Sequence, residues 1–369
     1  MDAVEDICRR FAVCGEVRAI SPLGRGHIND TFLIQYERGP DRVLQRLNTH
    51  VFPLPHRVMD NILRVSRHLE TKVSHLPHGQ RRYLRVVLTE SGEALLQDSQ
   101  EQAWRMYDRV DPALNFDRLE TCEQARSVGR SFGQFQAQLA DLPEPRLHET
   151  IADFHHTPRR LKRLQEVAEA DPQRRLTQVG RELDFVLERQ ARIEHLQARF
   201  ERGELPERIT HNDTKLNNLL FDEHGCEPLC VVDLDTVMPG LVHFDFGDMI
   251  RTGCNLADED EADVQRVGLD FGLFEAMAGG YLEAGKSFLT PAEVEELPAS
   301  AALMTLELGI RFLTDHLEGD RYFKIHHPGH NLQRARSQFA LVKSLEQAEP
   351  RMHDWMLSRW QQLLQCAPS

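Results

Sequence analysis

Apolar and polar residues follow two different patterns along the chain. Up to about residue 107, the apolar residues gather in short runs such as VRAISPLG, DTFLIQY and RVLQRLN, separated by Gly, Pro and Asp. Short apolar runs bounded by turn residues predict β-strands. One stretch, from about Val58 to Glu70, has helical spacing instead. We therefore predict a small, strand-rich N-terminal lobe over residues 1–107.

From Asp117 onwards the apolar residues are mostly three or four positions apart, as in amphipathic helices, and the charged stretch Pro158 to Arg202 continues this pattern. One segment breaks it: RITHNDTKLNNLLFDEHGCEPLCVVDLD has two apolar runs around a turn at Asp222 to Gly225, which predicts a β-hairpin. We predict an α+β protein whose larger lobe, residues 108–369, is mostly helical. Its later helices are expected near residues 261–284, 291–317, 331–347 and 350–364.

Size and charge narrow the function classes. At 369 residues the chain exceeds the length at which one hydrophobic core usually stops growing, so two lobes with a ligand cleft are expected. The formal net charge of -14 repels polyanions and argues against nucleic acid as a partner. The sequence has no long apolar run that predicts a membrane span and no signal-peptide pattern at its start, and its seven cysteines are scattered. We therefore expect a cytoplasmic protein with reduced thiols.

Three polar residues fall at one end of the predicted hairpin. Asp213 lies in the loop before the first strand, Asn218 begins that strand, and Asp233 ends the second. Antiparallel pairing brings the start of one strand beside the end of the next. Amide and carboxylate oxygens at such an edge suit Mg²⁺, which usually completes its shell with water and substrate phosphates. We predict that Asn218 and Asp233 bind Mg²⁺, and that Asp213 is a base or orienting group in phosphoryl transfer.

The spacing of this segment, His, one residue, Asp, four residues, Asn, matches a kinase-type catalytic loop. His211 suits a structural role in bracing the loop through hydrogen bonds. Lys215 is placed to reach a transferred phosphate, and a surface lysine explains it equally well. A solvated loop is the alternative for the whole segment, because Asn and Asp favour turns for their own hydrogen-bonding reasons.

Two other motifs are set aside. The tripeptide DFG within Asp245 to Asp248 has no apolar strand before it, and GDMIR after it looks helical, so Asp233 is the better candidate metal ligand. GYLEAGKS, Gly280 to Ser287, has the spacing of a P-loop. A P-loop follows a buried strand and opens a helix, whereas the residues before this one have helical spacing. We therefore interpret Gly285 as the C-terminal residue of a helix.

The N-terminal lobe offers candidate nucleotide contacts. LGRGHINDTF places Gly24 and Gly26 in a turn between two strands, which suits a phosphate-covering turn or an ordinary hairpin turn. The strand VLQRLN carries one cation for the α- and β-phosphates, Arg46, which is otherwise a strand-surface arginine.

THNDTKLNN, VVDLDTVMPG and FDFGDMIR, in this order and spacing, resemble the aminoglycoside phosphotransferase and choline kinase superfamily. A closer likeness, to the bacterial N-acetylhexosamine 1-kinases, runs from GHIND through LQRLNTHVFP and AWRMY to LELGIRFLTDHLEGDRYF and HPGHNLQRARSQ. It covers essentially the whole chain.

The resemblance implies a two-lobed protein-kinase-like fold, with ATP and Mg²⁺ as cofactors and an N-acetylhexosamine as the acceptor whose anomeric hydroxyl attacks the γ-phosphate. Residue by residue, Asp213 resembles the catalytic base, and Asn218 and Asp233 resemble the metal ligands. The segment Trp104 to Val110, with Tyr107, resembles the hinge that contacts adenine. The positions that resemble the sugar contacts are His27, Asp233, Arg311 and Tyr322.

We therefore expect an ATP-dependent sugar 1-kinase that makes the 1-phosphate of N-acetylglucosamine or N-acetylgalactosamine. One rival keeps the fold and changes the acceptor to choline, an aminoglycoside, homoserine or another hexose. A second is an inactive kinase-like binding module, against which the three intact residues Asp213, Asn218 and Asp233 argue. A third is a P-loop protein that uses Lys286.

Overall fold

The computed structural model describes residues 2–13, 15–24, 28–225 and 227–365, which fall into two compact units. Unit 1 comprises Met1–Asn115, Asp141–Ala152 and Asn218–Pro239, and unit 2 comprises Phe116–Ala140, Asp153–Asn217 and Gly240–Ser369. The chain crosses from one unit to the other five times, after Asn115, Ala140, Ala152, Asn217 and Pro239. An antiparallel sheet in one unit and helices in the other confirm the predicted α+β class.

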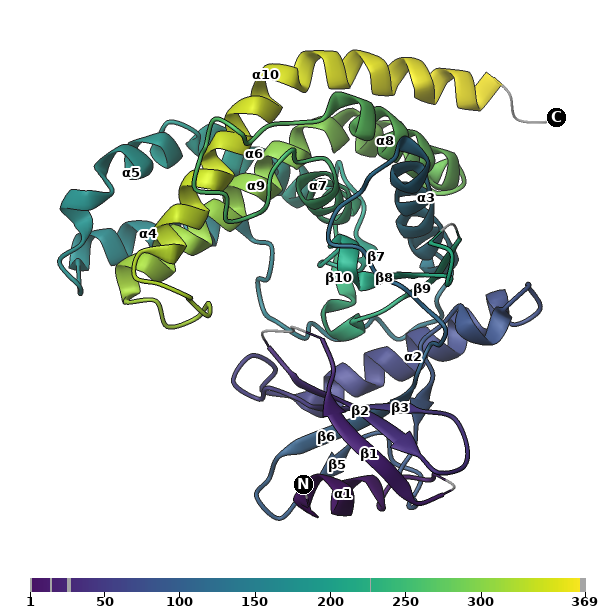
Figure 1. Ribbon diagram of the computed structural model, residues 1–369. Coiled ribbons are helices and arrows are strands. Elements are labelled where there is room, and N and C mark those ends of the chain that lie inside the picture. The colour runs from purple at the N-terminus through teal and green to yellow at the C-terminus, as the bar shows by residue number, and fades with distance from the viewer. Residues whose placement is uncertain (1, 14, 25–27, 226, 366–369) are drawn as a thin grey trace. The chain divides into compact units, whose positions relative to one another are not determined.

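Unit 1 is built on an antiparallel sheet of order β1-β2-β3-β6-β4, with β5 also paired to β6 (Figure 1). Its strands are β1 (Val17–Pro22), β2 (Asp30–Tyr36), β3 (Arg42–Arg46), β4 (Val86–Val87), β5 (Leu96–Gln97) and β6 (Ala103–Asp108). Because side chains alternate between the two faces, Leu44, Trp104 and Met106 share one face, where they pack in a core with residues of α1 (Asp2–Cys8). Arg105 and Tyr107 therefore point to the opposite face.

Helix α2 (Pro55–Val73) and a second hairpin complete unit 1. The helix extends the predicted stretch by about a turn at its N-terminal end and begins with Pro55, a favourable first helical residue. The buried Asn61 of α2 donates hydrogen bonds to the carbonyls of His148 (2.8 Å) and Val237 (3.0 Å). The hairpin of β8 (Leu219–Phe221) and β9 (Pro228–Val231) is present as the sequence predicts. One amide thus ties the three segments of unit 1 together.

Unit 2 contains the helices α3 (Cys122–Leu139), α4 (Thr157–Ala170), α5 (Gly180–Leu187), α6 (Gln190–Glu201), α7 (Val242–Gly253), α8 (Phe271–Gly285), α9 (Pro291–Glu318) and α10 (His330–Gln365). Short 3-10 turns lie at Gly79–Arg81, Leu176–Gln178, Leu216–Asn218 and Leu234–Thr236, and the short strands β7 (Arg208–Thr210) and β10 (Met238–Gly240) flank the hairpin in sequence. A core of Leu, Ile, Val and Phe side chains from α4, α9 and α10 holds one side of the unit together.

Glycines explain how closely α3 and α8 pack. A side chain at Gly129 would collide with the backbone of Met277, and one at Gly280 with the backbone of Arg126. Gly280 and Gly285 lie within α8, and Lys286 caps that helix, so the P-loop motif is part of a helix and its end, as interpreted from the sequence. Gly280 serves the approach of two helices.

Two helix predictions differ from the structure. The helix expected from residue 261 begins only at Phe271, with Asp270 as its N-cap, and the acidic run Asp258–Asp263 lies in the loop before it. The helices expected at 331–347 and 350–364 are one helix, α10, with Pro350 inside it. Proline removes one backbone hydrogen bond and bends a helix without having to end it, and α10 changes direction along its length in Figure 1. Among the described residues, no helix is long and apolar enough to cross a membrane.

Candidate active site

The backbone of the catalytic-loop candidate is held by a buried carboxylate. The side chain of Asp245, in the first turn of α7, accepts the N–H groups of His211 (2.9 Å) and Asn212 (2.6 Å). The carbonyl of Asp245 accepts the hydroxyl of Thr214 (2.6 Å). Burial raises the pKa of Asp245, against the smaller lowering effects of His211 and the two amides. Asp245, which sequence analysis set aside with the DFG tripeptide, therefore fixes the loop rather than a metal.

Replacing Asp245 with Asn should destabilise the protein. The amide NH₂ would face a backbone N–H, leaving a buried donor unpaired, and we expect the free energy of unfolding to fall by about 2–4 kcal/mol. Urea denaturation measures the change. Asp270→Asn is the matched control, because Asn caps a helix about as well as Asp and should leave stability within about 0.5 kcal/mol. Equal stability of the two variants would contradict the bracing role.

Asp213 and Lys215 form the polar face of the loop. Lys215 Nζ lies 3.1 Å from Asp213 Oδ1, and the side chains are 43% and 27% exposed respectively. Burial raises the pKa of Asp213, but the charges of Lys215, His211 and Arg251 outweigh it and hold the pKa below its usual value. Asp213 in turn raises the pKa of Lys215. The pair is thus a carboxylate beside an ammonium group, suited to act on a hydroxyl next to a phosphate.

Two carboxylates in unit 2 bind the guanidinium group of Arg251. Its guanidinium donates to Asp248 Oδ1 (2.7 Å) and to Glu259 Oε2 (2.8 Å). Glu259 belongs to the acidic run Asp258–Asp263, close to where the sequence predicts a helix to begin near residue 261. That start is wrong, because the run lies in a loop, where Glu259 pairs with Arg251 and favours the charged form of Lys215.

His211 is fully buried, and its ring meets Phe132 and Phe135 edge-on, at centroid distances of 6.2 and 5.8 Å. Its Nδ1 accepts the backbone N–H of Asp213 at 3.3 Å. The ring therefore contacts the loop from the apolar side. A structural role for His211 agrees with this geometry.

The hairpin in unit 1 brings Asn218 and Asp233 to one edge. Leu219 pairs with Val231, and the N–H of Val232 donates to the carbonyl of Asn218 at 2.9 Å. Asp233 follows with φ +59°, a left-handed backbone that non-glycine residues rarely adopt. An amide oxygen and a carboxylate at such an edge fit Mg²⁺, which prefers hard oxygen ligands and needs few from protein when phosphates supply others. Among the described residues, no three His, Cys, Asp or Glu side chains could hold a metal ion by themselves.

Behind this edge lies a buried ion pair that the sequence did not reveal. Arg105 of β6 and Asp235, which are 1% and 2% exposed, form an ion pair through Nη1 and Oδ1. Arg105 Nε also donates to Gln45 (2.9 Å), and Asn29 donates to Asp235 Oδ2 (2.8 Å). Burial lowers the pKa of Arg105, but Asp235 and Tyr107 raise it further, so the guanidinium stays charged. The pair anchors the chain just after Asp233 to β6.

The remaining nucleotide candidates lie in unit 1. Arg46 pairs with Asp30 on the face of the sheet opposite Arg105, and its Nε lies 3.0 Å from Asp30 Oδ2. Tyr107 is 4% exposed on β6, beneath the guanidinium of Arg105. Gly24 has φ +75°, which suits glycine in a tight turn. Gly26 and His27 lie outside the described residues. The roles of these five residues stay predictions.

Arg311 and Tyr322, the acceptor candidates, lie together in unit 2. The Arg311 guanidinium lies 5.4–5.7 Å from the ring centres of Phe154, Phe323 and Tyr322, and 3.5 Å from the Tyr322 hydroxyl. Arg160 Nη2 donates to the carbonyl of Phe154 (2.8 Å), the residue whose ring Arg311 contacts, so two guanidinium groups lie around one residue. Burial and the charge of Arg311 lower the pKa of Arg160. This cluster combines cations, aromatic faces and an exposed hydroxyl.

A known protein family matches most of the residues described above. The family described as "Phosphotransferase enzyme family" matches this chain over residues 19–280, which include the loop, the hairpin, β6 and Asp245. The chain belongs to this phosphotransferase family.

Solved structures share the fold of this phosphotransferase. A microcompartment-associated aminopropanol kinase is similar with a TM-score of 0.63 at 15% identity, over 95% of this chain and 98% of that one. The choline kinase from Cryptosporidium parvum has a TM-score of 0.59 at 13% identity, over 98% and 99% of the two chains. A spectinomycin phosphotransferase, in complex with ADP and spectinomycin, has a TM-score of 0.55 at 10% identity, over 94% and 98%. At these identities the likeness shows the fold.

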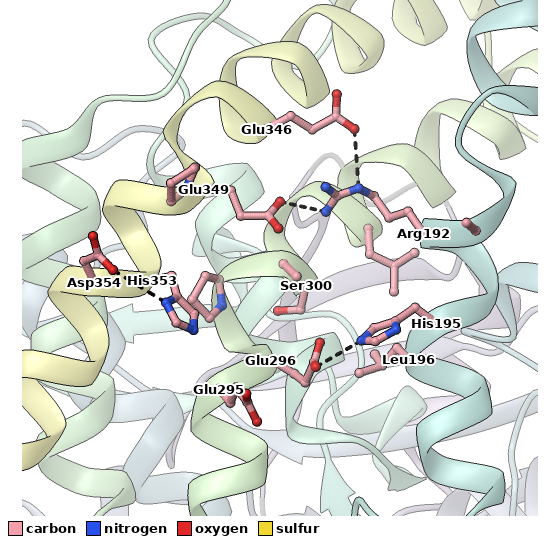
Figure 2. A pocket seen from close by; sticks show the side chains of 15 residues that line it. Arg192, His195, Leu196, Glu295, Glu296, Ser300, Glu346, Glu349, His353 and Asp354 are labelled. Atoms are coloured by element: carbon pink, nitrogen blue, oxygen red, sulfur yellow. Dashed lines mark hydrogen bonds and ion pairs between the residues drawn. The ribbon is translucent and has the colours of Figure 1, made fainter.

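A surface cavity of about 660 Å³ in unit 2 of the phosphotransferase is separate from the predicted residues. Figure 2 shows its lining from α6, α9 and α10, including Arg192, His195, Glu296 and Glu349. Its charged groups largely neutralise one another: Arg192 pairs with Glu349 (2.7 Å) and His195 with Glu296 (3.0 Å). None of the predicted catalytic, metal or acceptor residues lines it.

Sequence reasoning missed three functional candidates of this phosphotransferase: Arg105, Asp245 and His155, whose ring contacts the backbone carbonyl of Asn212 at 2.8 Å. Asp245 had a usable signal, because a carboxylate in the first turn of a helix after the hairpin is placed to accept backbone N–H groups. Arg105 had a weaker one, a charged residue inside the apolar run AWRMY, which demands a buried partner. His155 had none.

Proposed function

We propose that this phosphotransferase is an ATP- and Mg²⁺-dependent kinase of the anomeric C1 hydroxyl of N-acetylhexosamines, and that it acts in the cytoplasm. ATP is the donor in this proposal because the related spectinomycin phosphotransferase binds ADP. The product is the sugar 1-phosphate, a precursor for nucleotide-sugar formation in carbohydrate metabolism. The acceptor choice is carried by one observation, the pair of guanidinium groups in the Arg311 cluster.

That cluster favours an uncharged, oxygen-rich acceptor. Aminopropanol, choline and spectinomycin, the compounds in the names of the related structures, carry amino or ammonium groups. Arg311 and Arg160 would repel such cations in a partly buried site. Guanidinium N–H groups donate to sugar hydroxyls and an acetamido oxygen, and the exposed Tyr322 offers a ring face and a hydroxyl. A neutral N-acetylhexosamine satisfies both conditions.

The proposed chemistry assigns each loop residue one task. Asp213, held ionised, orients or accepts the proton of the attacking C1 hydroxyl. Lys215 beside it neutralises charge that gathers on the transferred phosphoryl group, and Asn218 and Asp233 would hold Mg²⁺. When bound, Mg²⁺ supplies charge neutralisation for the phosphates.

The test is ATP consumption by the purified protein with Mg²⁺ and a panel of acceptors: N-acetylglucosamine, N-acetylgalactosamine, glucosamine, galactose, homoserine, choline and kanamycin. We expect turnover confined to the two N-acetylhexosamines, with the product identified as the 1-phosphate by ³¹P NMR. Arg311→Met should raise KM for the sugar at least about tenfold and leave KM for ATP within about twofold, since it removes charge-assisted hydrogen bonds to the acceptor alone.

Other outcomes select among the rivals. Turnover with choline or kanamycin and none with the sugars would keep the kinase and reject the sugar assignment. ATP binding without turnover of any acceptor would favour a binding module.

A further inference from the structure

A buried histidine joins the catalytic-loop candidate to helix α9. His155 Nδ1 lies 2.7 Å from Glu307 Oε1, and His155 Nε2 lies 2.8 Å from the backbone carbonyl oxygen of Asn212. The His155 and Glu307 side chains are 7% and 1% exposed. Both ring nitrogens are thus engaged within unit 2, away from water.

The chemistry of the partners fixes the protonation state of His155. A backbone carbonyl can only accept a hydrogen bond, and so can an ionised carboxylate. Glu307 also accepts the hydroxyl of Thr157 at 2.6 Å, and burial, which raises its pKa, is outweighed by His155, so the pKa is lowered overall. Both nitrogens of His155 must therefore donate, which only the imidazolium can do. The pKa of His155 agrees with this state: burial lowers it, but the charge of Glu307 and its hydrogen bond outweigh burial, so that the pKa is raised overall.

The charged groups that act most strongly on the His155 ring both come from helix α9. Helix α9 presents Glu307 and Arg311 to His155, and the Arg311 charge opposes that of the imidazolium. The ring of Phe244 from α7 packs 5.0 Å from the His155 ring, and that of Phe154 packs at 4.4 Å. Glu307 is thus the counter-ion that keeps the imidazolium charged.

The two peptide groups that flank Asn212 are both fixed. The N–H of Asn212 is held by Asp245, and the carbonyl of Asn212, which is bonded to the nitrogen of Asp213, is held by His155. Asn212 has φ +64°, a left-handed conformation that needs such support. The direction of the Asp213 side chain follows from this backbone.

We propose that His155 is a positioning residue for phosphoryl transfer: as an imidazolium it fixes the peptide between Asn212 and Asp213, and ties it through Glu307 to the helix that carries Arg311. This inference rests on the proposed function, because the transfer assisted by Asp213 defines what is positioned. Glu307 and Arg311 are one helical turn apart on α9. This helix therefore supports Asp213, through His155, and also carries Arg311, a candidate contact of the acceptor.

The main test compares His155→Gln with a matched variant, His195→Gln. His195 also pairs with a glutamate of α9, Glu296, but is 53% exposed at the cavity of Figure 2. Glutamine carries its N–H donors on a single nitrogen and cannot donate at both ring positions, so His155→Gln should lower kcat by about 10- to 100-fold, with KM for ATP within about twofold. His195→Gln should keep kcat within about twofold. Equal kcat in the two variants, at equal folded fraction, would overturn the proposal.

The pH profile separates positioning from a merely structural role. Glu307→Gln removes the counter-ion, so burial should lower the pKa of His155 below the ordinary value of about 6.5, and the imidazolium should be lost as pH rises from about 5 to 7. We expect kcat of Glu307→Gln to fall over this range while wild-type kcat does not. A loss of activity that is the same at every pH would show that Glu307 and His155 only hold the fold.

The protonation state of His155 can be measured without any substrate, so this test does not depend on which acceptor the protein uses. Two-dimensional ¹H–¹⁵N spectra of the histidine rings should show one imidazolium at pH 8 that is absent from His155→Gln. A neutral tautomer at His155 would overturn the proposal even if N-acetylhexosamines are turned over. If the sugars are not substrates but the imidazolium is found, the acceptor assignment fails and the kcat comparison is made with whichever acceptor of the panel is used.

Discussion

Replacing Asp213 with Asn should lower kcat by about 10²- to 10⁴-fold, the usual contribution of a positioned base. The amide keeps the shape of the carboxylate but cannot accept the proton of the acceptor hydroxyl. ATP binding should stay within about twofold, because the substitution removes a group that acts on the acceptor hydroxyl. Single-turnover phosphoryl transfer measures the rate, and calorimetric titration with ATP measures the binding.

Lys286→Ala is the control for this variant. Lys286 caps α8 within the P-loop motif, and its removal should leave kcat within about twofold. Loss of activity in Lys286→Ala with full activity in Asp213→Asn would reverse the assignment. The pH profile adds a second check. Because the pKa of Asp213 is held below its usual value, its active, ionised form persists to lower pH. We therefore expect kcat to show no acid limb from Asp213 above about pH 4, the ordinary pKa of Asp.

The second large effect concerns the buried ion pair of unit 1. Arg105→Met should lower the free energy of unfolding by about 3–5 kcal/mol, because it leaves the buried Asp235 carboxylate without a counter-ion. Removing both partners should cost far less, since a buried pair replaced by apolar groups of similar volume is often close to neutral. Urea denaturation of Arg105→Met, Asp235→Leu and the double variant forms the complete cycle.

Arg46→Met supplies the matched control on the opposite face of the same sheet. Arg46 also pairs with an aspartate, Asp30, but the two side chains are 43% and 52% exposed. An exposed pair contributes about 0–1 kcal/mol, so this variant should unfold nearly as wild type does. A similar loss of unfolding free energy in Arg46→Met and Arg105→Met would show that burial is not the reason why the Arg105 pair stabilises the protein.

Local sequence patterns predicted several helices and the hairpin at their observed positions. Helical spacing located α2, α3 and α9, and the turn between two apolar runs located the β8–β9 hairpin, because these elements are decided by residues close in sequence. The prediction failed for residues 331–364, which were expected to form two helices, because α10 continues through Pro350 as one helix. It also failed for the acidic run, where a loop contact with Arg251 replaces the expected helix start.

The residues of the candidate site also fall into a group that the sequence indicated and a group that it did not. The types and spacing of Asp213, Asn218 and Asp233 indicated a candidate catalytic and metal site, and the family resemblance alone indicated Arg311 and Tyr322 as acceptor contacts. The sequence did not indicate the residues that hold them. Asp245 contacts Asn212 across 33 positions, and His155 contacts it across 57, and no periodicity links residues so far apart. Such partners follow from tertiary packing alone.

The interleaving of the two units has a consequence for synthesis on the ribosome. Unit 1 begins the chain, but its last segment, Asn218–Pro239, is made only after two segments of unit 2. A nascent chain that ends before Asp235 has Arg105 in β6 without the carboxylate that pairs with it. Unit 1 therefore cannot finish folding when its first segment is complete at Asn115, and must wait until the chain reaches Pro239.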